Sequence, residues 1–299
     1  MLLRNFLVIL TIVLVIVLAT LVWFYPGNED FRSDNPFWNG TKNLGSITRA
    51  SPLESLSDLP MSPQGSTLIL IPYLPFTSVE LELLDTFVTN GGTLILADDY
   101  GYGNQILEYL GLGARFSGQA LLDPFSNYKN SRFPRISRII PSPVTDNVDS
   151  LIFDHGTSLI DIETADTLAL SSSFSFLDLN GDEEKDGDEP TGPFPVIAQY
   201  SLGNGKTILV SDPSIFINSM QTIEGNYTFI QNIDAITAIK LLVAQSHLPG
   251  SDLRYAKNWL VDVRKGLISP VGTASLVVLA VLVMLMPVWL KRQGEAFSG

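Results

Sequence analysis

Two long apolar runs set the first limit on how this chain folds. The first, FLVILTIVLVIVLATLVWFY, covers Phe6–Tyr25, and the second, LISPVGTASLVVLAVLVMLMPVWL, covers Leu267–Leu290. Each run is long enough to cross a bilayer as a helix, and each is apolar on every side. No small-residue cleavage pattern follows the first run, so we interpret it as an uncleaved signal anchor. The sequence therefore predicts two transmembrane helices.

The charges beside these runs indicate how the chain crosses the membrane. Arg4 precedes the first run, Glu29 and Asp30 follow it, and Lys291 and Arg292 end the second run. The positive-inside rule then predicts a two-pass cell-membrane protein with both termini in the cytoplasm.

This topology divides the chain into six parts. The predicted cytoplasmic ends are residues 1–5 and 291–299, the spans are 6–25 and 267–290, the extracytoplasmic domain is 26–247, and a juxtamembrane helix or linker is 248–266. Arg264 and Lys265, just before the second span, argue weakly for the opposite orientation. Two tripeptides suit an outer domain as N-glycosylation acceptors, NGT at Asn39 and NYT at Asn226.

The composition excludes several classes of function. The 299-residue chain has a formal net charge of −13 and contains no cysteine. The negative charge argues against binding to nucleic acid or to anionic lipid headgroups. The absence of cysteine excludes disulfides, thiolate metal sites and cysteine nucleophiles.

The stretch between the apolar runs has the pattern of an α/β domain. STLILIPYL (Ser66–Leu74) and TLILADD (Thr93–Asp99) are typical of buried strands. Between them lies a helical stripe of apolar residues that begins at Thr77 or Ser78 and ends at Gly91. A second helix, QILEYLG, follows the second strand. Strands and helices that alternate at this spacing predict a mostly parallel sheet.

Later segments predict three more elements. TLALSSSFSFL (Thr167–Leu177) is typical of a strand that leads into an acidic segment. Two β-rich runs flank GNG and predict a hairpin with Asn204-Gly205 at its tip. NIDAITAIKLLVAQSH (Asn232–His247) predicts one closing helix.

Three segments carry a resemblance to a known family. They are NPFWNG (Asn35–Gly40), GGTLILADDYGYGN and GPFPVIAQYSLGNGKTILVSDPSIFIN. Together they resemble an uncharacterised prokaryotic family of membrane-anchored domains of unknown function, often encoded beside a MoxR-type ATPase. The segment that begins at Ser66 is also similar to the class I glutamine amidotransferase-like fold, a flavodoxin- or Rossmann-like α/β fold. The resemblance implies a distant relation to the GIFT domains of gliding-motility, intraflagellar-transport and oligosaccharyltransferase proteins.

The resemblance covers most of residues 30–247. The positions at which this chain departs from the amidotransferase pattern are those that carry the catalytic residues. An amidotransferase needs a cysteine at the turn after the strand, activated by a histidine. This chain has Asp98, Asp99 and Tyr100 at that turn, and it also lacks the G-x-S-x-G pattern of a serine nucleophile. The resemblance therefore implies a scaffold without glutaminase activity, and a fold alone does not define a function.

Three acids stand where predicted strands end. Asp98 and Asp99 follow one strand, and Asp212 follows another. Ligands of open α/β sheets bind at this end of the strands, so these carboxylates could bind a sugar or a cation, or act as acid and base. A plainer interpretation also holds for each, because Asp often caps a turn through its own side chain.

Trp38 and Asn35 are further candidates for ligand binding. An aromatic ring beside Asn side chains suits a sugar, whereas a Trp in this setting also often anchors a core. His155 has no second histidine at metal-ligand spacing, and we expect it to be structural or exposed.

The segment DLNGDEEKDGDEPTGPFP (Asp178–Pro195) is a candidate calcium loop. The residues at positions 1, 3, 5, 7, 9 and 12 of the calcium-loop template are Asp178, Asn180, Asp182, Glu184, Asp186 and Glu189, and Glu184 would contribute its backbone carbonyl. Residues 178–189 carry seven acids and one lysine, and a divalent cation would remove their repulsion. Glu183 replaces the template's Gly at position 6, and the prolines that follow exclude an outgoing helix. The segment is therefore either a calcium clip between strands or a solvated acidic loop.

These features predict a non-enzymatic extracytoplasmic binding or scaffold module, held in the lipid bilayer and carrying calcium. Its expected ligand is a glycan or a partner protein of the same membrane complex, and a link to a MoxR-type ATPase is implied by the resemblance alone. The alternative is a cell-surface hydrolase or transferase that uses Asp98, Asp99 and Asp212. That enzyme requires the three carboxylates to converge in one cleft, with at least one strongly perturbed pKa.

Overall fold

The chain forms two units. The computed structural model describes the backbone of residues 2–296 and the side chains of residues 3–282, 284 and 285. One unit is Pro26–Pro249, and the other consists of Met1–Tyr25 with Gly250–Gly299. The first unit contains the predicted α/β domain, and the second contains the apolar helices.

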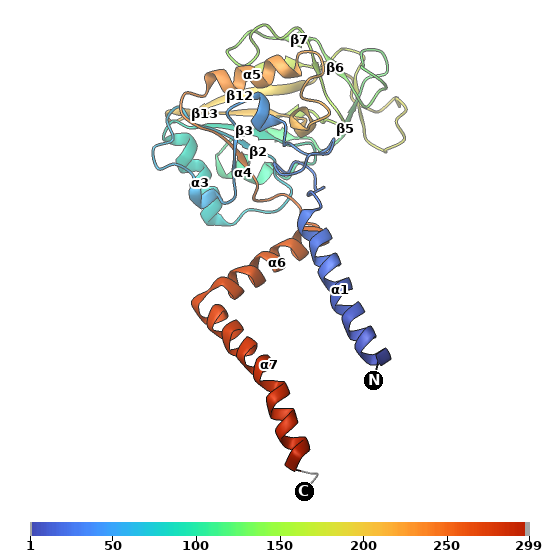
Figure 1. The fold of residues 1–299 in the computed structure, drawn as a ribbon. Helices are drawn as coiled ribbons and strands as arrows, with labels where there is room; N and C mark the ends of the chain where they lie inside the picture. The colour runs from blue at the N-terminus through green and yellow to red at the C-terminus, as the bar shows by residue number, and fades with distance from the viewer. Residues whose placement is uncertain (1, 297–299) are drawn as a thin grey trace. The chain divides into compact units, whose positions relative to one another are not determined.

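An eight-stranded sheet forms the centre of the Pro26–Pro249 unit (Figure 1). Its strands lie in the order β1 (Ser51–Leu53), β14 (Leu241–Ala244), β2 (Thr67–Leu70), β3 (Thr93–Ala97), β13 (Gly205–Val210), β12 (Pro195–Leu202), β10 (Asp166–Leu170) and β7 (Arg138–Ile139). The first five strands run parallel, and the last three continue the sheet by antiparallel pairing. The prediction of an α/β domain with a mostly parallel sheet is confirmed.

Smaller elements surround this sheet. Three two-stranded ribbons pair β4 (Arg115–Phe116) with β9 (Leu159–Ile160), β5 (Ala120–Leu122) with β11 (Phe176–Asp178), and β6 (Arg135–Ile136) with β8 (Leu151–Ile152). The helices are α2 (Leu44–Ile47), α3 (Ser78–Thr89), α4 (Asn104–Tyr109) and α5 (Asn226–Ile236), and two 3₁₀ turns are η1 (Leu56–Asp58) and η2 (Pro213–Phe216).

The central strands are buried on both faces, which explains their uninterrupted apolar runs. Side chains alternate along each strand, so Leu68 of β2 enters a core with Leu84 of α3, while Ile69 enters a second core with Ile230 of α5. In Figure 1, α3 and α4 accordingly lie on one side of the sheet and α5 on the other.

Helix α3 begins where the sequence predicts. Thr77 accepts a hydrogen bond from the backbone N–H of Glu80 (3.3 Å), and the Glu80 carboxylate accepts one from the backbone N–H of Thr77 (2.9 Å). This capping box satisfies two N–H groups that the first turn of a helix leaves without partners. Gly91, with φ of 106°, follows the end of the helix in a conformation that favours glycine.

The prediction of one closing helix over Asn232–His247 is wrong in its second half. Helix α5 ends at Ile236, and Leu241–Ala244 form the buried strand β14 between β1 and β2. A short apolar run does not distinguish a buried strand from a buried helix, and here the strand is selected by pairing on both of its edges.

The tip of the β12–β13 hairpin also differs from the prediction. Leu202 pairs with Gly205, so Gly203 and Asn204 form the two-residue loop. Gly205 is needed for a different reason, since a Cβ there would lie 2.2 Å from the carbonyl oxygens of Val88 and Gly92.

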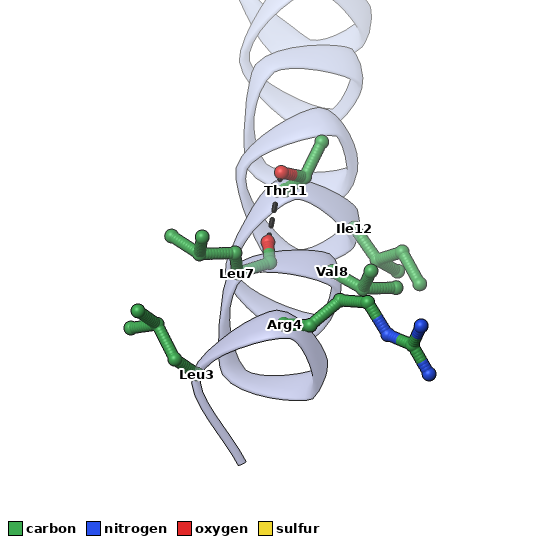
Figure 2. Close-up of a pocket in the computed structure, with 6 residues that line it drawn as sticks. All are labelled: Leu3, Arg4, Leu7, Val8, Thr11 and Ile12. Carbon is green, nitrogen blue, oxygen red and sulfur yellow. Dashed lines mark hydrogen bonds between the residues drawn. The ribbon is translucent and has the colours of Figure 1, made fainter. Parts of the chain in front are cut away.

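Helix α1 (Leu2–Phe24) is the one helix that is by itself long and apolar enough to cross a membrane, within the part of the chain that the structure describes. Figure 2 shows its first turns, where the Thr11 hydroxyl donates a hydrogen bond to the Leu7 carbonyl (2.9 Å). The Thr20 hydroxyl donates in the same way to Ile16 (2.8 Å). Both hydroxyls are thus satisfied within the helix, as an apolar solvent requires.

A second independent span is not confirmed. The predicted linker and second span form two helices, α6 (Asp252–Ile268) and α7 (Pro270–Ala296). Within the described residues, they are long and apolar enough to cross a membrane only when taken together, and the pair is bent by 75°. The bend falls at Ser269, because the residue before a proline is pushed out of the helical conformation. The predicted cytoplasmic ends include residues 1 and 297–299, which lie outside the described residues.

Candidate functional site

A cleft of about 320 Å³ lies where the segments after β2, β3 and β13 meet. The parallel direction of these strands brings their carboxyl ends to one edge of the sheet, the usual ligand site of open α/β sheets. The cleft is lined by Asp30, Phe31, Trp38, Asn39, Tyr73, Asp99, Tyr100, Phe133, Asp154, His155, Ser214 and Ile217.

Aromatic rings form much of the cleft wall. Tyr73 stacks on Phe31 with ring centroids 5.6 Å apart and meets the edge of Tyr100 at 5.9 Å. Burial, followed by the charge of Asp99, raises the pKa of Tyr73, so its hydroxyl stays protonated and able to donate a hydrogen bond. Trp38 is 66% exposed and is therefore not the core anchor that one interpretation of the sequence allowed.

Asp98 holds a turn and does not line the cleft. One carboxylate oxygen accepts hydrogen bonds from the backbone N–H groups of Tyr100 (2.9 Å) and Gly101 (3.0 Å), and the other accepts one from Gly103 (2.6 Å). The residue is 2% exposed. Of the roles predicted for Asp98, the geometry supports capping of the turn.

Asp99, the next residue, lines the cleft. Its Oδ1 atom is buried and has no hydrogen-bond donor among the described residues. Burial, with the neighbouring charge of Asp98, raises the pKa of Asp99 to about 7. A carboxyl group with this pKa can either accept or donate a hydrogen bond near neutral pH, which makes it a candidate for binding or proton transfer.

Asp212 is fully buried and caps η2. Its carboxylate accepts hydrogen bonds from the backbone N–H groups of Ser214 (2.8 Å) and Asp154 (2.6 Å). Burial raises its pKa well above the ordinary value. Asp212 therefore holds the segment of Asp154, which lines the cleft. Of the three predicted strand-end acids, only Asp99 lines the cleft itself.

Asp154 and His155 are cleft residues that the sequence interpretation missed. Nδ1 of His155 lies 2.5 Å from Oδ1 of Asp154, and the histidine ring meets the edge of Phe133. His155 has φ of 60°, an uncommon backbone conformation for a residue other than glycine. A signal was present, since an acid and a histidine follow directly after the apolar run Leu151–Phe153.

Asn35 supports the cleft from behind. It is fully buried, its amide donates to the Glu29 carbonyl (2.8 Å) and to Asn39 (3.0 Å), and its side-chain oxygen accepts from Phe37 N–H (2.8 Å). Asn35 is not among the residues that line the cleft. The residue fastens the loop that carries Trp38.

The two glycosylation candidates differ in their surroundings. The amide nitrogen of Asn226, the atom that would carry a sugar, is buried and donates to the carbonyls of Ile152 (2.9 Å) and Met220 (3.1 Å). A glycan on Asn226 is incompatible with this fold, which corrects that prediction. Asn39 is only partly buried, and its amide donates to Asn28 and Asp30.

The acidic segment forms a loop between β11 and β12, as predicted. Asp178 accepts hydrogen bonds from the backbone of Gly181 (2.6 Å) and Glu183 (3.1 Å), and Glu189 accepts from Leu179 (2.7 Å) and Asp186 (3.1 Å). These contacts close the loop on itself.

The predicted calcium ligands divide into two sets. Asp178 and Glu189 are buried, whereas Asn180, Asp182, Glu184 and Asp186 are exposed. Asn180 donates to the carboxylates of Asp182 (3.1 Å) and Asp186 (2.9 Å). No three His, Asp or Glu side chains among the described residues form a group that could hold a metal ion. Calcium binding stays a prediction.

Comparison with models of protein families shows which family the chain belongs to. The model of the domain of unknown function DUF4350 matches residues 33–233. The chain belongs to the DUF4350 family. The match covers the sheet from β1 to β13 and the cleft residues from Trp38 to Ile217. No curated protein matches the sequence.

Several solved structures are similar to this chain at a low level. The mmIFT52 N-terminal domain is 17% identical with a TM-score of 0.45, and the match covers 57% of this chain and 77% of that domain. A β-galactosidase from Bacillus circulans sp. alkalophilus is 16% identical with a TM-score of 0.36, over 57% of this chain and 22% of the enzyme. An exo-β-1,4-mannosidase from Opitutaceae bacterium strain TAV5 is 15% identical with a TM-score of 0.32, over 64% of this chain and 27% of the enzyme. This chain thus spans about a quarter of each glycosidase, and these likenesses identify neither a ligand nor a reaction.

The raised pKa of Asp99 predicts how stability depends on pH. Folded Asp99 holds its proton up to about pH 7, whereas the unfolded chain releases it near the ordinary value of 3.8, so this residue costs stability as pH rises through that window. Asp99→Asn removes the cost. We expect the melting temperature of the variant to exceed that of the parent by more at pH 8 than at pH 5, because only part of the window between the two pKa values lies below pH 5. A gain of 1 kcal/mol corresponds to about 2–4 °C.

The matched control is Glu82→Gln, which removes one exposed carboxylate on α3. Thermal melting followed by circular dichroism measures both variants at the two pH values. An equal shift for Asp99→Asn at pH 5 and pH 8 contradicts the assignment of the raised pKa to Asp99.

Proposed function

We propose that this DUF4350 protein is a membrane-anchored, non-enzymatic binding module whose cleft holds a glycan or a segment of a partner protein. The observation that carries the proposal is the exposed indole of Trp38 at the same cleft as the unpartnered carboxyl oxygen of Asp99. An aromatic face packs against the apolar side of a sugar ring, and carboxyl groups accept hydrogen bonds from its hydroxyls.

The cleft also has the dimensions and pre-formed walls that such binding requires. Its volume of about 320 Å³ suits one or two sugar rings, within the range of small-molecule sites. The wall is supported before any ligand arrives, because Asn35, Asp98 and Asp212 each hold a cleft segment through backbone hydrogen bonds. A pre-organised site loses little conformational entropy on binding.

The placement in the membrane is part of the proposal. Helix α1 anchors the chain, α7 crosses the membrane a second time, both termini lie in the cytoplasm, and residues 26–247 lie outside. The apolar length of α1 supports the first span, the apolar run Leu267–Leu290 supports the second, and the charges that flank the two runs support the orientation. The GIFT-related fold and a membrane-complex partner linked to a MoxR-type ATPase rest on the family resemblance.

A second candidate function is catalysis at the same cleft. It is favoured by the Asp99 pKa of about 7, which suits a general acid or base, and by the Asp154–His155 pair in the same wall. A hydrolase or transferase would then use Asp99, with Asp98 and Asp212 in supporting roles. Conversion of a bound glycan, lost in Asp99→Asn while binding is retained, distinguishes this enzyme from a binding module.

Calcium in the acidic loop is a further part of the proposal. Glu183 stands at template position 6 with φ of 65°, the left-handed conformation for which the template uses glycine. The loop also places Asp178 and Glu189, template positions 1 and 12, close to its own backbone at both ends. A calcium ion would draw the exposed carboxylates of Asp182 and Asp186 toward these two.

Binding is tested with the full-length protein in detergent on a glycan microarray, followed by titration of any glycan retained. We expect Trp38→Ala to weaken binding at least about tenfold, since loss of a central aromatic contact costs about 1.4 kcal/mol or more. Phe125→Ala is the matched control, because Phe125 is 77% exposed and is not part of the cleft wall.

The ligand is identified as a protein if the array retains no glycan and a membrane protein co-purifies with the parent but not with Trp38→Ala. A Trp38→Ala protein that binds every ligand as the parent does contradicts the proposed site.

Membrane topology is tested by single cysteines, because the natural chain has none to give a background. We expect Ser62→Cys to react with a membrane-impermeant maleimide on intact cells. Gln293→Cys should react only after the membrane is permeabilised. Labelling of both positions on intact cells excludes the two-pass arrangement.

Calcium is tested by thermal melting of the full-length protein with calcium and then with a chelator. We expect calcium to raise the melting temperature by several degrees, because a ligand that binds only the folded state stabilises it. Asp182→Asn should remove most of the rise. Asp188→Asn, an equal charge change in the same loop outside the template positions, should keep it. No shift for the parent, or equal loss in both variants, refutes a specific site.

A further inference from the structure

Helix α6 is amphipathic, with an apolar stripe on one side and its basic residues, together with Val261 and Ile268, on the other. Its apolar residues recur at alternating spacings of three and four, which places them in one stripe along the helix. The stripe consists of Leu253, Ala256, Leu260, Val263 and Leu267. Tyr255 and Trp259, four residues apart, flank it along one side. None of the seventeen residues of α6 is buried, and Tyr255 and Trp259 are 67% and 65% exposed.

The other face of α6 is basic in a chain that is otherwise acidic. Arg254, Lys257, Arg264 and Lys265 lie away from the apolar stripe, against two acids, Asp252 and Asp262. Lys265 lies 3.7 Å from Asp262 and both side chains are exposed, so this pair leaves the face basic overall. The net charge of −13 therefore hides a local positive charge on this helix.

The bend between α6 and α7 determines how the two faces of α6 are oriented relative to the membrane. The two helices meet at 75°, so α6 runs nearly parallel to the membrane surface if α7 crosses the membrane (Figure 1). A helix in this position can direct an apolar stripe into the acyl chains and its basic residues toward the headgroups. Tyr and Trp are enriched at this depth, because their rings are apolar at one end and polar at the other.

We infer that α6 is an interfacial helix that binds the membrane surface through anionic phospholipid headgroups. The apolar stripe enters the boundary between headgroups and acyl chains, and the basic face holds the lipid phosphates. The inference rests on the membrane placement of α7 in the proposed function. It also explains Arg264 and Lys265, whose position before the second span disagrees with the positive-inside rule, as lipid ligands of α6.

Single nitroxide labels measure this arrangement in the full-length protein, reconstituted in liposomes of phosphatidylcholine with or without phosphatidylglycerol. The chain has no native cysteine, so each label is unique. Trp259→Cys and Val263→Cys report on the apolar side of α6. Asn258→Cys reports on the polar side, and Val278→Cys on α7 serves as the membrane reference. The depth of each label in the membrane is obtained by comparing its accessibility to oxygen with its accessibility to a water-soluble nickel complex.

We expect the labels at 259 and 263 to lie about 5–10 Å below the headgroup boundary in liposomes that contain phosphatidylglycerol, with the label at 258 in water. In phosphatidylcholine alone, the labels at 259 and 263 should move outward. Lys257→Gln/Arg264→Gln/Lys265→Gln should abolish this dependence on lipid charge, while the label at 278 stays immersed.

Three outcomes overturn the inference. Nickel access at both 259 and 263, with 278 immersed, places α6 in water and leaves the proposed topology standing. Exclusion of both oxygen and nickel at 259 and 263 shows that a protein surface, such as a second copy of this chain, covers the stripe. Nickel access at 278 overturns the second span of the proposed function and the inference together.

Discussion

The Pro26–Pro249 unit depends on the burial of its central strands from both sides. Alternate side chains of β2, β3 and β13 enter two separate cores, one with α3 and α4 and one with α5. A shift of register by one residue would exchange the two sets of side chains, so the pairing of these strands is strongly specified. Because parallel strands bring their carboxyl ends to one edge, segments far apart in the sequence meet there. Tyr73, Asp99 and Ser214 line one cleft for this reason.

Acids at that edge differ in role because their oxygen atoms differ in partners. Asp98 and Asp212 accept hydrogen bonds from backbone N–H groups and thereby hold turns. A buried carboxylate needs such partners, because burial without hydrogen bonds is energetically costly. Asp99 has a buried oxygen that has no donor within the described part of the chain, and a pKa of about 7, and it lies in the same cleft wall as Tyr73 and Tyr100. This combination suits both functions proposed for the cleft, the binding of a glycan and proton transfer.

Part of this site could be anticipated from the sequence. Asp99 follows a recognisable strand, and the placement of ligand sites at strand ends is general, so its position was predictable. Turn capping by Asp98 was one of two interpretations of the sequence, and only the fold shows that its carboxylate accepts the N–H of Gly103. The role of Asn35 was not predictable, because it depends on which backbone groups lie within reach after folding. Asp154 and His155 reach the cleft from an irregular insertion whose path has no local sequence signature. Similarly, Leu241–Ala244 becomes a strand only because β1 and β2 offer two free edges.

By itself, the sequence determined the apolar helix α1, the mostly parallel α/β unit, the capped start of α3 and the acidic loop between two strands. Each of these follows from local periodicity, capping residues or composition, which act over a few neighbouring positions. The tertiary structure decided which acid faces the cleft, which asparagine is buried, and that no residue of the apolar stripe of α6 is fully buried. These properties depend on contacts between segments that are distant in the sequence, and the local sequence around a residue does not specify which distant residues contact it after folding.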